Sequence, residues 1–99
     1  MHVISKKKLR EFWAFHPEAK SPLDHWFRIA KRADWADFSE LRATFRAADQ
    51  VEKYTVFNIG GNKYRLITHM NYRRQIVYVL FVFTHKQYDE EEWKRDCGC

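Results

Sequence analysis

The first half of the chain repeats apolar residues with the period of an α-helix. One stripe, at positions i, i+3, i+4 and i+7, consists of Leu9, Phe12, Trp13 and His16. Ser5 can cap the start of this helix and Pro17 cannot continue it, so we expect the helix to end near residue 16. The apolar start at residues 2–4 predicts a short edge strand.

A second helical stripe consists of Leu23, Trp26, Phe27 and Ala30. Ser21 is its expected N-cap and Pro22 its first helical residue. A shorter helical turn is predicted after it by the spacing of Phe38, Leu41 and Phe45. Aromatic stripes of this kind usually form core, so we interpret both as packing surfaces rather than as a cofactor site.

From Val51 the pattern becomes that of β-strands. Residues 51–59 are rich in β-branched and aromatic side chains and predict one strand. The motif Gly60-Gly61-Asn62 tolerates positive φ and predicts a hairpin turn, with a return strand over residues 63–70. Side chains alternate along a strand. One face of the return strand should therefore carry Lys63, Arg65, Ile67 and His69, and the helix-facing side Tyr64, Leu66, Thr68 and Met70.

The last third of the chain predicts one more turn, strand and helix. Residues 71–75 make the turn, and residues 76–84 are nearly continuous apolar, as in a central strand covered on both faces. Residues 88–95 can form a final acidic helical segment. Helices followed by strands indicate an α+β fold, with the helices packed on a small, mainly antiparallel sheet.

Length and composition fit a single domain over residues 1–99, with residues 96–99 as a flexible tail. Of the 99 residues, 45% are apolar and 17% aromatic, enough for a small core. The longest apolar run is too short to span a membrane, and no apolar segment follows the lysines at the N-terminus. We therefore expect a cytoplasmic protein without a membrane partner.

The two cysteines, Cys97 and Cys99, carry little information. Two thiols cannot complete a four-ligand zinc site, and a disulfide scaffold needs more of them. We interpret them as a solvated, reduced tail, with oxidative cross-linking in vitro as the alternative.

Charge changes the picture, because the predicted sheet is basic. The net charge is +5, and no Asp or Glu occurs between Lys53 and Tyr88. The cationic or titratable side chains of this stretch are Lys53, Lys63, Arg65, Arg73, Arg74, Lys86, His69 and His85. Carboxylates hold the metals of magnesium-dependent nucleases, so the pattern favours a site without metal or cofactor, or a simple phosphate-binding surface. A sheet face that is basic without function is the other interpretation.

RNA cleavage without metal requires a base, an acid and stabilisation of the phosphorane charge. An imidazole titrates near neutral pH, so His85 could be the acid or the base. Arg65 and Arg74 (or Arg73) could stabilise the phosphorane. Lys86 could bind the same phosphate or donate a proton. The rings available to stack on unpaired bases are those of Tyr72 and Tyr88.

Three segments together resemble one protein family. Residues 54–67 read YTVFNIGGNKYRLI, residues 82–86 read VFTHK, and residues 87–89 read QYD, with Trp93 shortly after. In this order, and with the MHVI start and two aromatic helices, the chain resembles the HigB-type toxins of the RelE-like superfamily. The resemblance covers nearly the whole chain.

This resemblance implies a type II toxin that cleaves mRNA, often in the ribosomal A site, and so inhibits translation and growth. It implies a HigA-like helix-turn-helix antitoxin, through which the complex reaches operator DNA. It also implies a free monomer and a complex of two toxins with two antitoxins. The family motif maps onto Asn62, Arg65, His85, Lys86 and Tyr88. Lys63 is expected to bind RNA with them, and so are Tyr72 and Arg73, whose turn varies among relatives.

Two other functions remain open at this point. A non-catalytic RNA- or ribosome-binding module could use the same basic sheet without a proton-transfer residue. A protein-binding module could instead present its basic face to an acidic partner. Gly60 and Gly61 are interpreted as structural in every case.

Overall fold

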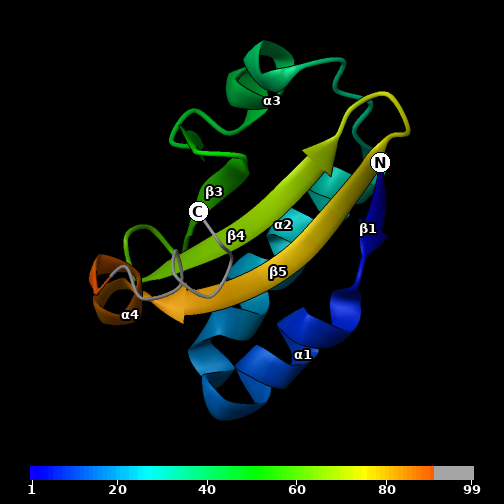
Figure 1. Ribbon diagram of the computed structural model, residues 1–99. Coiled ribbons are helices and arrows are strands. Elements are labelled where there is room, and N and C mark those ends of the chain that lie inside the picture. The colour runs from blue at the N-terminus through cyan, green and yellow to red at the C-terminus, as the bar shows by residue number, and fades with distance from the viewer. Residues whose placement is uncertain (91–99) are drawn as a thin grey trace.

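The structure, a computed structural model, describes residues 1–90 and contains one five-stranded sheet with helices on one side (Figure 1). The elements in chain order are β1 (His2–Ile4), α1 (Lys6–Phe15), the 3₁₀ helix η1 (Pro17–Ala19), α2 (Lys20–Arg32), α3 (Phe38–Thr44), β2 (Asp49–Val51), β3 (Tyr54–Ile59), β4 (Tyr64–Asn71), β5 (Ile76–Thr84) and α4 (His85–Asp89). The predicted α+β class is confirmed. Cys97, Cys99, Trp93 and the predicted helical segment beyond residue 90 lie outside the described residues.

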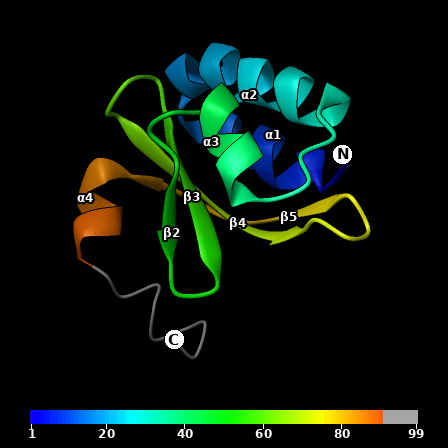
Figure 2. The same ribbon diagram turned by 90° about the horizontal axis from the view of Figure 1, so that it is seen from above.

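The strand order is β1-β5-β4-β3-β2, in which β1 runs parallel to β5 and all other neighbours are antiparallel. Helices α1, α2 and α3 lie against one face of this sheet (Figure 2). We call the opposite side the open face. Its side chains include Tyr54, Val56, Arg65, Ile67, His69, Tyr78, Leu80, Phe81 and Phe83. No helix of residues 1–90 is long and apolar enough to cross a membrane.

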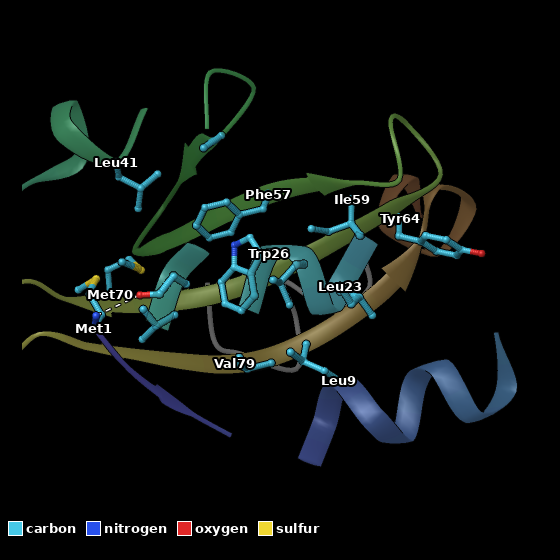
Figure 3. Close-up of a cluster of buried hydrophobic side chains, with 14 of the residues drawn as sticks. Met1, Leu9, Leu23, Trp26, Leu41, Phe57, Ile59, Tyr64, Met70 and Val79 are labelled. Atoms are coloured by element: carbon cyan, nitrogen blue, oxygen red, sulfur yellow. Dashed lines mark hydrogen bonds between the residues drawn. The ribbon is translucent and has the colours of Figure 1, made fainter. Parts of the chain in front are cut away.

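The main core lies between the helices and the sheet (Figure 3). Trp26 of α2 is 1% exposed and meets the ring of Phe57 edge to face, with centroids 5.3 Å apart. Leu9 of α1 and Leu41 of α3 are fully buried in the same cluster. Both predicted helical stripes are thus core, as the spacing indicated.

The starts of the helices differ in part from the prediction. Ser5 does occupy the N-cap of α1, although its side chain makes no capping hydrogen bond. The predicted cap at Ser21 is wrong, because α2 begins at Lys20 with Ala19 at its N-cap. The chain turns through η1 immediately after Pro17 and passes directly into α2, which leaves no extended residue at position 21 to act as a cap.

The single strand predicted over residues 51–59 is two strands of a hairpin. β2 ends at Val51, and β3 begins at Tyr54 after a two-residue turn in which Glu52 has φ 56°. Neither Glu52 nor Lys53 is a typical residue for positive φ, so the turn had no sequence signal. The next turn is confirmed, with φ of 62° at Gly60 and 70° at Gly61.

A β-bulge at Leu80 explains why β5 is continuously apolar. Ile67 pairs with Phe81 and Thr68 with Val79, so Leu80 is an extra residue. The bulge reverses the alternation: Val77, Val79 and Val82 contact the helix-side core, and Leu80, Phe81 and Phe83 contact the open-face cluster. The expectation of a strand covered on both faces is therefore wrong, since Leu80 to Thr84 are all only partly buried.

Candidate functional site

Three segments meet at one end of the sheet: the β3–β4 turn, the start of β4, and the junction of β5 with α4 (Figure 1). The backbone N–H of His85 donates to the carbonyl oxygen of Lys63 at 3.0 Å, which joins the turn to α4. Register pairs Arg65 with Phe83 across the two strands. This arrangement brings together Asn62, Lys63, Arg65, His85, Lys86 and Tyr88, which we call the basic corner.

The guanidinium of Arg65 is held in place by its neighbours. Its Nη2 donates to Asn62 Oδ1 at 2.6 Å, and its Nη1 donates to the carbonyl oxygens of Asn62 and Tyr64 at 3.3 and 3.1 Å. The Cζ atom lies 5.6 Å from the centroid of the Tyr88 ring, a cation–π contact. The side chain is half-buried, so its plane is fixed before any ligand arrives.

His85 is the first residue of α4 and is oriented by Asp89. Its Nδ1 lies 3.0 Å from Asp89 Oδ2, one helical turn further on. Since a carboxylate can only accept, Nδ1 carries the proton and Nε2 of the neutral ring has a free lone pair. Both side chains are about half exposed, which leaves Nε2 accessible to a substrate.

The start of α4 is fixed by a capping box. The Thr84 hydroxyl accepts from the Gln87 N–H at 3.2 Å, and Gln87 Oε1 accepts from the Thr84 N–H at 2.9 Å. This geometry holds His85 against the end of β5. Asp89, Thr84 and Gln87 were missed by the sequence reasoning. The i, i+4 spacing of His85 and Asp89 and the T-x-x-Q pattern were the available signals.

The remaining members of the basic corner are more exposed. Lys63 lies in the turn and Lys86 on α4, and both are exposed to solvent. The half-buried Tyr88 packs against the open-face cluster, beside Arg65. The corner therefore combines two exposed ammonium groups with a guanidinium held by hydrogen bonds, an aromatic ring and an imidazole.

Tyr72, Arg73 and Arg74 lie at the opposite end of β4, in the turn to β5 (Figure 1). The eight residues of β4 span about 26 Å, so a phosphate that contacts Arg65 cannot also contact Arg74. Both arginines are exposed. The hydroxyl of Tyr72 is buried and its ring packs on the helix-side core, and this burial raises the pKa of the phenol.

A polar contact anchors β4 behind the basic corner. The hydroxyl of Tyr64 donates to a carboxylate oxygen of Glu18, which follows Pro17 in η1. The hydrogen bond raises the pKa of Tyr64 to about 12 and lowers the pKa of Glu18 below its ordinary value. It ties the helical layer to the strand that carries Arg65.

Known proteins resemble the chain along most of its length. A family model described as HigB_toxin, RelE-like toxic component of a toxin-antitoxin system, matches residues 19–91. The mRNA interferase toxin HigB of Escherichia coli strain K12 is 30% identical over 92 residues, which cover 90% of this chain and 88% of the relative. The mRNA interferase HigB of Escherichia coli O6:H1 strain CFT073 is 29% identical over 93 residues, covering 91% and 90%. The mRNA interferase HigB of Shigella flexneri is 30% identical, with coverage of 90% and 88%.

Proposed function

Since the chain belongs to the HigB family, the RelE-like toxic component of a toxin–antitoxin system, we propose that it is an endoribonuclease that cleaves messenger RNA. One observation carries this proposal. The pairing of β4 with β5 brings two groups to the same corner: the His85 imidazole, oriented by Asp89, and the Arg65 guanidinium, held by Asn62. A base and a phosphate-binding cation are two of the three groups that transphosphorylation of RNA requires, and the lysines of the same corner can supply the third, an acid.

In the proposed reaction, His85 Nε2 removes the proton from a 2′-hydroxyl of the RNA. The 2′-oxygen attacks the adjacent phosphorus, and the bond from phosphorus to the 5′-oxygen breaks. Arg65 binds the two non-bridging oxygens as their charge increases, because its planar donors match a phosphate. Lys86 or Lys63 supplies the proton for the departing 5′-oxygen. The products are a 2′,3′-cyclic phosphate and a 5′-hydroxyl end.

We also propose that the reaction needs no metal ion. Asp89 is engaged by the His85 ring and Glu18 by the Tyr64 hydroxyl. Within residues 1–90, no three or more His, Cys, Asp or Glu side chains are placed to hold a metal. The donors of the basic corner are otherwise cations and an amide, which suit phosphate better than a divalent ion.

The partners follow from the same proposal. We expect the chain to act in the cytoplasm on mRNA bound to the ribosome, whose ordered RNA would supply alignment that a small exposed site lacks. We expect a HigA-like helix-turn-helix antitoxin to neutralise it, in a complex of two toxins with two antitoxins that binds operator DNA through the antitoxin. These finer statements rest on the family and on the charge of the basic corner.

The test is to map new 5′ ends in abundant mRNAs after brief induction in a bacterial host. Wild type should produce ends within coding regions. His85→Ala and Arg65→Ala should reduce them by roughly 10²–10⁴-fold, while His25→Ala and Arg10→Ala, exposed on α2 and α1, should not. On free single-stranded RNA, which avoids the ribosome's own need for magnesium, the purified protein should cleave at the same rate with and without EDTA.

A non-catalytic RNA or ribosome binder is the alternative. It predicts no new ends from any variant, although the protein still binds RNA and slows growth. Ends that persist in His85→Ala but vanish in Arg65→Ala would keep the ribonuclease and assign the proton transfer to another residue of the basic corner.

A further inference from the structure

A pocket lies on the open face, away from the basic corner. It has a volume of about 270 Å³ and is lined by Lys53, Tyr54, His69, Tyr78 and Leu80. The proposed reaction uses none of these residues. Its lining is largely aromatic and apolar, with a single ammonium group, a composition that differs from the cations of the basic corner.

The rings of this pocket are arranged as a platform. His69 of β4 and Tyr78 of β5 face each other across the two strands, with centroids 6.1 Å apart and planes 29° from parallel. Lys53, in the β2–β3 turn, holds its Nζ 5.5 Å from the centroid of the Tyr54 ring. Lys53 therefore places a positive charge at the rim of a flat aromatic surface.

The His69 ring is oriented by a hydrogen bond. Its Nδ1 lies 3.2 Å from the carbonyl oxygen of Lys53, which can only accept, so Nδ1 carries the proton. Nε2 of the neutral ring then presents a lone pair. Such an atom can accept a hydrogen bond from the amino or imino N–H of a nucleobase.

We propose that this pocket binds an unpaired base of the RNA substrate, stacked on His69 and Tyr78, with Lys53 at the neighbouring phosphate. The inference rests on the proposed ribonuclease function and extends its substrate site along the sheet. A base fits better than a bare phosphate, because the lining offers rings and an aliphatic side chain and only one cation.

Position on the sheet supports the same occupant. His69 is four residues from Arg65 on β4 and on the same face, a separation of about 13 Å. Between them lies an apolar cluster in which the partly exposed Leu80, Phe81 and Phe83 pack over the buried Ile67, and the ring centroids of Phe81 and Phe83 are 5.3 Å apart in a stacked arrangement. A single strand that is cut at the basic corner would continue over these rings to the pocket. The three strands that carry this surface, β3, β4 and β5, contain no Asp or Glu.

The experiment uses a short single-stranded RNA that spans a mapped cleavage site, with a 2′-deoxy nucleotide at the cut to block cleavage. Each base in turn is replaced by an abasic residue, and Kd is measured with the full-length protein. For wild type, there should be one position, separated from the cut, at which an abasic residue weakens binding by about tenfold. In His69→Ala and in Tyr78→Ala, an abasic residue at that position should not weaken binding beyond the effect of the protein variant itself. His25→Ala, a change at an exposed histidine of α2, should behave as wild type.

His69 is exposed, so His69→Ala keeps the test valid if Tyr78→Ala fails to fold. The inference is overturned if abasic residues weaken binding equally at every position, or if no position loses its effect in the His69 and Tyr78 variants. Cleavage of mRNA in cells would in that case still support the proposed function. Failure of wild type to bind any of these RNAs also overturns the inference, and the mapping of cellular ends then decides the function separately. Loss of neutralisation by the antitoxin, without loss of RNA binding, would make the pocket a protein contact.

Discussion

The Nδ1 atom of His85 lies 3.0 Å from a carboxylate oxygen of Asp89, so the acidic end of the chain contributes to the basic corner. The carboxylate selects one tautomer of the imidazole and aims the other nitrogen outward. Sequence reasoning placed all acids outside the site and assigned His85 its role without a partner. The structure supplies that partner, one helical turn away.

Replacing this carboxylate should slow cleavage without abolishing it. In Asp89→Asn the amide can also donate to Nδ1 and favour the tautomer whose Nε2 carries the proton. Both side chains are half exposed, so we expect a loss of about tenfold in rate, well below that of His85→Ala. Single-turnover cleavage would measure it, with Glu11→Gln on α1 as the control. A rate equal to wild type would show that Asp89 does not orient the base.

Asn62 should act through Arg65. Asn62→Ala removes the 2.6 Å hydrogen bond and frees the guanidinium to rotate, so the cleavage rate should fall by about tenfold. In an Arg65→Ala background the same change should have little further effect, because contacting residues are not additive. The measurement is a double-mutant cycle of cleavage rates. Additive losses would indicate that Asn62 contacts RNA independently of Arg65.

The arginines of the β4–β5 turn should affect affinity rather than chemistry. They lie at the end of the sheet opposite the basic corner, so Arg73→Ala/Arg74→Ala should leave the single-turnover rate at saturation unchanged. If each binds a phosphate of single-stranded RNA, the slope of log K against log salt should fall by about 1.4. A drop in the saturated rate would instead return Arg74 to the reaction itself.

The Glu18–Tyr64 hydrogen bond should make stability depend on pH on both sides of neutrality. The pKa of Glu18 is lowered by folding, so its contribution is present above its ordinary value of 4.5 and lost as the pH falls through the lowered one. Tyr64 is raised from 10 to about 12, so its contribution is present below pH 10 and lost between pH 10 and 12. Tyr64→Phe should destabilise most between pH 5 and 10, and less outside this range. Urea unfolding across pH would measure the difference, with Tyr78→Phe as the control.

The indole N–H of Trp26 is buried and lacks a hydrogen-bond partner within residues 1–90. Trp26→Ala should destabilise the fold by about 3–5 kcal/mol through the cavity it leaves. Trp26→Phe should cost only about 1–2 kcal/mol, because it also removes an unsatisfied donor. Denaturant unfolding compares the two. Equal losses would mean that the indole nitrogen is satisfied in solution.

The helices and the last two strands were predictable because one face of each is buried. Leu9, Trp26 and Leu41 each belong to an apolar stripe of helical period in their own helix, and Tyr64, Leu66 and Met70 alternate as expected of a strand facing helices. Gly60 and Gly61 predicted their turn correctly, because few other residues adopt positive φ so readily.

The errors arose where backbone geometry has no local signal. Glu52 adopts positive φ although it is neither Gly nor Asn, so the residue types did not predict the β2–β3 turn. The bulge at Leu80 reverses the faces of β5, and a continuous apolar run cannot reveal such a reversal. For the site, the motif indicated Asn62, Arg65 and His85, whose convergence depends on the pairing of β4 with β5. Arg74 lies far from Arg65 because the two residues are at opposite ends of β4, and residue type alone does not indicate this separation.

The parallel pairing of β1 with β5 has a consequence during translation. His2 pairs with Ile76, so the first strand to be synthesised can pair only after the last strand has been made. Sheets with such distant pairings form slowly. The basic corner is also assembled from residues 62–88. A toxin message that is itself cut before the codon for Ile76 therefore yields a fragment that lacks β5, the pairings of β5 with β1 and β4, and His85. Cleavage of its own transcript would silence the toxin rather than release a shortened active form.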